Sequence, residues 1–107
     1  MGSWWLCLQQ TVYQIAVDHG WWKDNRNDSE LIMLMVCELG EAVEWLRKGN
    51  PPSDHIVKFS GVEEELADVV IRIMDMAQAK GYNIEEAIEA KVEFNKTRPY
   101  KHGGKLF

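Results

Sequence analysis

Proline occurs at only three positions, 51, 52 and 99, and this spacing limits the fold more than any other feature of the chain. An interior proline removes a backbone hydrogen bond and clashes with the preceding helical turn, so the long proline-free segments are free to form helices. No segment shows the sustained alternation of apolar and polar residues that is typical of a half-buried strand. The sequence therefore predicts an all-α protein.

Capping residues divide the chain into four predicted helices. The first covers about residues 3–18 and ends before Gly20, and the second begins at Asp28 or Ser29 and runs to about residue 48. The third follows a capping box formed by Ser60 and Glu63 and runs to about residue 80. The fourth covers about residues 84–97, before Pro99. A chain of 107 residues is expected to form a single domain, residues 1–107, with a modest core that an oligomer could complete.

The charge of the chain is unevenly distributed. The net charge is −5, but residues 91–107 are basic and the preceding 90 residues are strongly acidic. An acidic body argues against a protein that binds duplex nucleic acid, because such a protein needs a basic surface. No apolar run approaches the length of a membrane span, and the first residues lack the basic segment of a signal peptide. Cys7 and Cys37 match no metal or redox spacing, and Cys37 is expected to be a buried, reduced thiol. We therefore expect a cytoplasmic protein without a membrane partner.

Two pairs of carboxylates, each three residues apart, interrupt the apolar helical patterns. Glu38 and Glu41 belong to the second predicted helix, where Glu38 falls in the middle of an apolar stripe. Glu65 and Asp68 lie beside the apolar stripe of the third, which includes Leu66. Carboxylates are rarely buried unless something compensates the loss of hydration. Because a spacing of three places both acids on one side of a helix, the two pairs could converge on a common ion.

Oxygen ligands favour hard cations, so Mg²⁺ is the expected metal and Mn²⁺ a possible substitute. Di-iron bundles use Glu-x-x-His, which does not occur in this sequence. A buried ion-pair network to Arg72 and Lys91 is the alternative explanation of the acids. Lys91, Asn95 and Arg98 share one face of the fourth helix and could bind phosphate, or they could form a solvated basic helix end.

Together these motifs resemble the signature of the all-α nucleoside triphosphate pyrophosphohydrolases, the MazG-like and dCTP pyrophosphatase-like superfamily. The likeness covers about residues 20–105. It rests on the two acidic pairs, the Trp21-Trp22 loop, the run from Lys91 to Pro99 and the tail that contains Lys105. The resemblance implies a four-helix, MazG-like bundle completed by homo-oligomerisation, as a homodimer or homotetramer.

The resemblance also implies a function and a set of site residues. The expected reaction is Mg²⁺-dependent hydrolysis of a (d)NTP between the α and β phosphates to (d)NMP and pyrophosphate, and the expected role is house-cleaning of the nucleotide pool. Four acids would be the metal ligands and catalytic residues: Glu38, Glu41, Glu65 and Asp68. Lys91 and Asn95 would bind phosphate, with Arg98 and Lys105 as weaker candidates. Trp21 or Trp22 would lie against the base.

Three other interpretations of the sequence stay open. The same bundle could be a non-catalytic module that binds metal or nucleotide. It could be a helical interaction domain, in which Trp4, Trp5, Met33 and Met74 mark a groove for a partner. Within the enzyme class, the acids would serve a phosphoribosyl-ATP-type pyrophosphohydrolase equally well, because only the base and sugar contacts differ.

Overall fold

The computed structural model describes residues 3–99, and within them the chain forms four α-helices and no strand. The helices are α1 (Trp4–Asp18), α2 (Asp28–Arg47), α3 (Gly61–Lys80) and α4 (Ile84–Lys96). The predicted all-α class is confirmed, and each helix begins and ends within about two residues of the predicted position. None of the described helices combines the length and the apolar character needed to cross a membrane.

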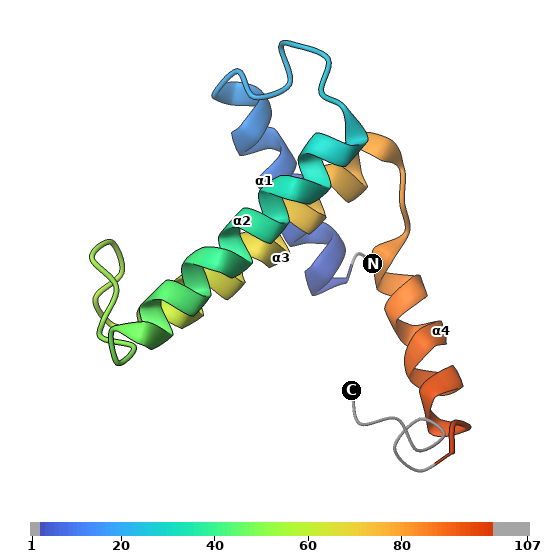
Figure 1. Ribbon diagram of the computed structural model, residues 1–107. Coiled ribbons are helices and arrows are strands. Elements are labelled where there is room, and N and C mark those ends of the chain that lie inside the picture. Colours follow the sequence, from blue (N-terminus) through green and yellow to red (C-terminus); the bar gives the residue numbers. More distant parts are fainter. Residues whose placement is uncertain (1–2, 100–107) are drawn as a thin grey trace.

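Helix α3 is the centre of the fold, because both α1 and α2 pack against it. Figure 1 shows α2 and α3 side by side over most of their length, with α1 across them and α4 standing apart. Helix α4 has no buried residue and makes at most marginal contact with the other helices. A single chain therefore forms a three-helix body with α4 as an arm.

Local capping explains where the helices begin and end. The Ser60 side chain accepts a hydrogen bond from the Glu63 backbone while the Glu63 side chain accepts one from the Ser60 backbone, so the predicted capping box is present. Gly20 and Gly81 adopt positive φ angles of 81° and 76° after α1 and α3. The cap of α2 differs from the prediction, because Asn27 accepts from the backbone of Ser29 at 2.7 Å.

The loop between α2 and α3 is fastened by polar contacts to Glu64. Ser53, which is buried, donates its hydroxyl to Glu64, and His55 Nδ1 lies 2.9 Å from the other carboxylate oxygen of Glu64. These contacts hold the loop against the first turn of α3. Glu64 thus has a structural role in the loop in addition to its favourable place at a helix N-terminus.

The core is small and lies where α2 and α3 meet the loop after α1. Leu31, Met35 and Met76 are buried, with Trp21 and Trp22 packed against them. Two expectations about burial were wrong. Leu66, assigned to the buried stripe of α3, is 47% exposed, because the buried face of the helix passes through its neighbour Glu65 instead. Cys37, expected to be buried, is exposed, because the buried face of α2 passes through Leu31, Met35 and Ala42.

The four side chains that could have marked a partner groove do not form one surface. Met74 is completely buried in the interior. Trp4 and Met33 are exposed, at 74% and 56%, and they belong to different helices, α1 and α2. The Trp5 indole donates a hydrogen bond to Gln9, a buried residue one turn on in the same helix. Met74 is therefore a core residue rather than part of a partner groove.

Candidate functional site

Three of the four predicted acids come together between α2 and α3. Glu38, Glu65 and Asp68 each offer an oxygen, and these three oxygens lie within 4.8 Å of one another. Glu38 comes from α2, whereas Glu65 and Asp68 are three residues apart on α3. The packing of α2 on α3 therefore produces the convergence that the spacing of the acids predicted.

Glu65 is the most buried member of this cluster. It is only 8% exposed, and its Oε2 atom has no hydrogen-bond partner among the described residues. Burial raises the pKa of Glu65 to about 7, and the neighbouring Glu38 and Glu41 add to the increase. Burial and the Glu38 charge also raise the pKa of Asp68. The site therefore holds more negative charge than its surroundings stabilise.

A divalent cation fits this arrangement. The three carboxylates supply only oxygen donors, which suits Mg²⁺ or Mn²⁺. The unpartnered Glu65 Oε2 is a buried acceptor that a cation would satisfy. A positive ion between the three carboxylates would also remove the mutual repulsion that disfavours their charged forms. Glu38, Glu65 and Asp68 are accordingly the residues that could hold the metal.

Glu41 lies close to the cluster but outside it. Its carboxylate is near enough to Glu65 to raise the pKa of that group, and both acids line a shallow hollow beside Trp45. Glu41 itself is exposed. The structure thus groups three of the acids tightly and places the fourth at the edge.

Arg72 provides the cation that contacts the cluster. Its Nη2 atom lies 3.4 Å from Glu38 Oε1, and within residues 3–99 no other ion pair reaches Glu38, Glu65 or Asp68. The alternative explanation, an ion-pair network of the acids with Arg72 and Lys91, is therefore confirmed for the contact between Arg72 and Glu38. Lys91 takes no part in this network, since its amino group lies over the Phe94 ring of its own helix. One arginine faces three carboxylates, so the network leaves a negative excess.

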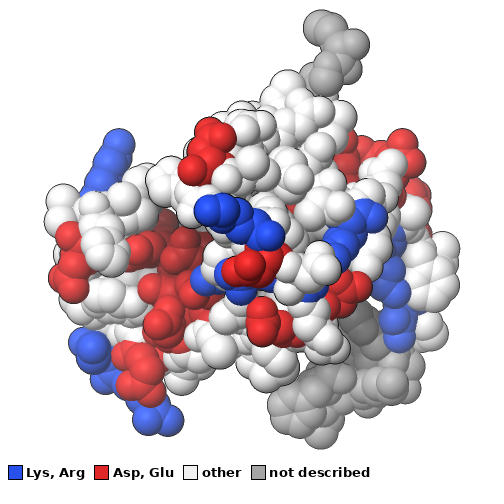
Figure 2. Space-filling model, turned by 90° about the horizontal axis from the view of Figure 1, so that it is seen from above, with Lys and Arg blue, Asp and Glu red and all other residues white. Residues whose placement is uncertain are grey.

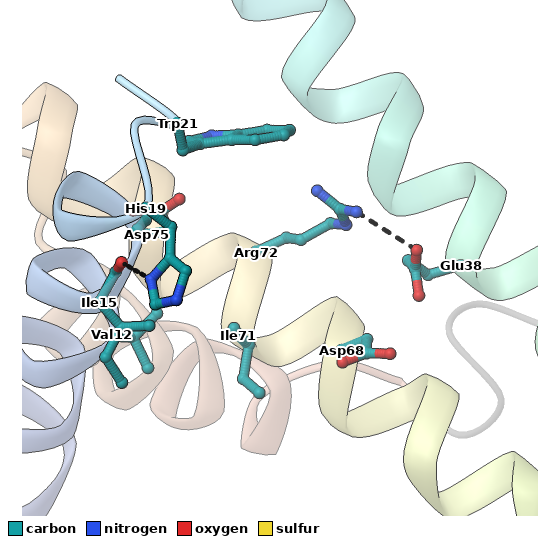
Figure 3. A pocket seen from close by; sticks show the side chains of 10 residues that line it. Val12, Ile15, His19, Trp21, Glu38, Asp68, Ile71, Arg72 and Asp75 are labelled. Carbon is teal, nitrogen blue, oxygen red and sulfur yellow. Dashed lines mark hydrogen bonds and ion pairs between the residues drawn. The ribbon is translucent and has the colours of Figure 1, made fainter. Parts of the chain in front are cut away.

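A cavity of about 390 Å³ opens beside the acids. Glu38, Asp68 and Arg72 line one part of it, and Figure 3 shows Arg72 between the Glu38 carboxylate and the Trp21 ring. The remaining lining comes largely from α1 and the loop that follows it: Val12, Ile15, Ala16, His19 and Trp21, with Ile71 and Asp75 from α3. The cavity is thus acidic near Glu38 and Asp68 and largely apolar beneath Trp21.

The structure separates the roles of the two adjacent tryptophans. Trp22 is a structural residue, because its indole donates to Asp75 at 2.9 Å and its ring lies 6.2 Å from the ring of Tyr13. Trp21 lines the cavity, and the Arg26 guanidinium stacks 3.6 Å from the centre of its ring. Of the pair, Trp21 is therefore the one placed to contact a ligand.

The basic residues of α4 are not brought to the acids. Lys91 and Asn95 are exposed, and neither they nor Arg98 line the cavity. Arg98 lies over the Phe94 ring at 5.7 Å, so it too is directed toward its own helix. Lys105 lies outside the described residues. Any contact of these residues with phosphate would need α4 to pack against the acidic site of this chain or of another copy.

His19 and the first helix are the part of the cavity that the sequence did not indicate. Three residues of α1 form its apolar wall, although the first 18 residues carried little of the family resemblance. His19 Nδ1 lies 2.8 Å from the Ile15 carbonyl. Because a carbonyl can only accept, Nδ1 is the donor in this contact. Asp68, Arg72 and Asp75, which line the opposite part of the same cavity, are spaced so that they lie on one face of α3. This spacing is the sequence signal that could have indicated the cavity.

Figure 2 shows acidic side chains clustered toward the left of the face in view, and acidic and basic side chains side by side near its centre. Comparisons of the chain with family models, with curated proteins and with solved structures returned no match. The geometry and charge of the site are therefore the basis on which its function is inferred.

The metal-free protein should lose stability as the pH rises from about 5 to about 7. The folded Glu65 keeps its proton up to about pH 7, whereas the unfolded chain releases it near 4.5, so deprotonation favours unfolding in this window. The effect of Glu65 is at most about 3 kcal/mol. Urea unfolding in the presence of a chelator should show this decline, and Glu65→Gln should largely remove it.

Glu89→Gln, which changes an exposed acid on α4, is the matched control and should keep the decline. A pH dependence that is the same in the wild type and in Glu65→Gln would contradict the burial of an uncompensated carboxylate at this position.

Proposed function

We propose that the protein is a Mg²⁺-dependent nucleoside triphosphate pyrophosphohydrolase of the all-α, MazG-like type. It would hydrolyse a (d)NTP between the α and β phosphates. The observation that carries this proposal is the trio Glu38, Glu65 and Asp68, in which Glu65 has an unsatisfied buried oxygen. Two of the three, Glu38 and Asp68, line a cavity that also has an aromatic and apolar wall. A triphosphate with its cation suits the acidic part of the cavity, and a nucleotide base suits the aromatic and apolar part.

In this proposal each side of the cavity has a distinct task. Glu38, Glu65 and Asp68 hold the cation, and Glu41 completes the set from the edge. Trp21 covers the base, and the apolar wall of α1 keeps water from it. The bound Mg²⁺ supplies charge neutralisation for the phosphates and lowers the pKa of water. Phosphoryl transfer depends mainly on such positioning and charge stabilisation, so carboxylates and a base pocket are sufficient equipment.

Pyrophosphate release from a panel of standard and damaged (d)NTPs, measured with Mg²⁺, tests the proposed activity. We expect release from at least one nucleotide and a fall of about a thousandfold in Glu38→Gln, because losing a ligand misplaces the metal. Glu89→Gln is the control for the loss of one acid and should keep wild-type activity.

No release with any nucleotide would reject the catalytic role and favour a binding module. Undiminished release by Glu38→Gln would reject the assignment of the site. Phosphoribosyl-ATP belongs in the panel, because release from it alone would select that reaction over hydrolysis of free nucleotides.

The proposed function includes assembly with a second copy of the chain. Five apolar residues on α2 are between 44% and 59% exposed. They are Ile32, Val36, Leu39, Val43 and Leu46. Their alternating spacing of four and three residues is that of the apolar seam along which two helices pack. Such a seam is self-complementary about a two-fold axis, so the same surface of a second copy can cover it. Large exposed apolar patches are uncommon on monomers.

Assembly also offers a place for α4. The arm exposes Ile88 and Val92, which are 46% and 49% exposed, together with Lys91 and Asn95. Packing of this apolar side against another helix would bury it. For Lys91, Asn95 and Arg98 to bind phosphate, that packing must also bring them toward an acidic cluster. Their proposed role therefore depends on the assembled form.

Light scattering should give at least twice the 12.4 kDa mass of one chain. Val43→Asp places a charge in the middle of the seam and should shift the protein toward the monomer, because burying an unpaired charge is costly. Val57→Asp makes the same change at a loop residue that is 74% exposed and should leave the mass unchanged. A wild-type monomer at micromolar concentration would contradict the assembly.

A further inference from the structure

We propose that Arg72 is a displaceable counter-ion of Glu38. Without a divalent cation its guanidinium neutralises Glu38; when the cation binds, Arg72 gives up this carboxylate and its guanidinium binds the phosphate chain of the nucleotide. The second half of this proposal rests on the proposed function, whereas the first concerns the metal site alone.

The contact between Arg72 and Glu38 is suited to being broken. It consists of one long hydrogen bond, 3.4 Å from Nη2 to Oε1, although a guanidinium has five donors and often binds a carboxylate with two. The Arg72 side chain is 32% exposed, so its charge is partly hydrated whether or not Glu38 is its partner. Releasing Glu38 therefore costs Arg72 little, because water can replace the lost contact. The Glu38 side chain is only 14% exposed, so it needs the divalent cation in place of Arg72.

Arg72 and a divalent cation would compete for Glu38. The Glu38 carboxylate belongs to the trio whose oxygens lie within 4.8 Å of one another, and it is also the one that Arg72 contacts. A cation held by the trio would come close to the guanidinium if that contact persisted. Two positive charges at such a distance repel each other, and in a partly buried site this repulsion is only weakly screened. Binding of the metal therefore drives Arg72 away from Glu38.

The position of Arg72 in the cavity determines where it goes. Its guanidinium carbon lies 5.5 Å from the centre of the Trp21 ring, and Figure 3 shows it between that ring and the acids. Asp75 lies one turn after Arg72 on α3, outside the trio, and lines the same cavity, so its negative charge attracts the released guanidinium.

In a nucleotide that spans the cavity from the acids to Trp21, the phosphate chain would lie next to the Arg72 guanidinium. The planar fork of donors on arginine matches the geometry of phosphate oxygens. Lys91 and Arg98 do not line the cavity in the single chain, whereas Arg72 already does. The same residue can therefore neutralise Glu38 in the absence of a divalent cation and contact the phosphates of the substrate in its presence.

The first arm of the test is a calorimetric titration of the nucleotide-free protein with Mg²⁺. Arg72→Gln should bind Mg²⁺ about tenfold more tightly than the wild type, because the competing charge is gone. Arg72→Lys keeps the charge and should stay close to the wild type. Far-UV circular dichroism of each variant verifies that the helices are intact.

Lys80→Gln is the matched control. Lys80 is also on α3, also forms an ion pair with an acid of α2 (Asp28, at 3.0 Å), and is 31% exposed. Its loss should leave Mg²⁺ affinity unchanged. A purely structural role of the helix-to-helix ion pair would affect Arg72→Gln and Lys80→Gln alike.

The second arm measures binding of a nucleotide analogue with a nitrogen between the α and β phosphates, at saturating Mg²⁺. Arg72→Gln should bind it about tenfold more weakly, since one charged contact to phosphate is lost. Lys80→Gln should bind it as the wild type does. The two arms thus predict opposite changes in Arg72→Gln, namely a higher affinity for Mg²⁺ and a lower affinity for the nucleotide analogue.

Unchanged or weaker Mg²⁺ binding in Arg72→Gln, or no Mg²⁺ binding by any of these proteins, would overturn the competition. Tighter Mg²⁺ binding with unchanged affinity for the analogue would overturn the phosphate contact. If the wild type bound Mg²⁺ but no member of the nucleotide panel, the proposed function would fail, and the metal titration would still decide whether Arg72 competes for Glu38.

Discussion

The desolvation of Glu65 is the constraint on which the rest of the site depends. A carboxylate that is 8% exposed, with one oxygen unsatisfied, can ionise readily only if a positive charge comes close to it. Glu38 and Asp68 increase this demand, because their charges lie within reach of the same point. Arg72 supplies this positive charge only in part, since it contacts Glu38 and leaves Glu65 Oε2 without a partner. The site thus favours a compact cation over a monovalent side chain.

The fold produces this constraint through the packing of α2 on α3. The acids of α3 lie on or next to its buried side, and Glu38 meets them from α2. Capping at Ser60 and the contacts of Glu64 with the loop fix where α3 begins and hold its first turn. The register of the acids along α3 follows from those local contacts. Helix α1 then closes one side of the cavity, so three helices together position one site.

Local chemistry made much of the fold predictable from the sequence. The capping box at Ser60 and Glu63 and the glycines with positive φ depend only on neighbouring residues, so the helix ends were located closely. The faces of the helices were less predictable. Leu66 is half exposed because the orientation of α3 follows from how α1 and α2 pack against it, which the apolar pattern of α3 alone does not determine.

For the site, the sequence indicated the acids but not the cavity. The spacing of the two acidic pairs predicted that all four acids converge, because each pair lies on one helix face. The structure brings Glu38, Glu65 and Asp68 together and leaves Glu41 at the edge. The distinction between Trp21 and Trp22 depends on a hydrogen bond to Asp75, 53 positions further along the chain, which no local pattern reveals. The contribution of α1 to the cavity wall is a contact between distant segments and was missed for the same reason. The phosphate roles of Lys91, Asn95 and Arg98 stay a prediction, because α4 stands apart from the site.

The most direct test of the central claim is the position of a Mn²⁺ ion, located by anomalous X-ray scattering in crystals of the wild-type protein. The account predicts a peak within about 2–2.5 Å of carboxylate oxygens of Glu38, Glu65 and Asp68, with the Glu65 oxygen that lacks a partner among its ligands. Crystals grown with saturating Mn²⁺ that show no peak at this cluster, or a peak only at other surface acids, would contradict the account.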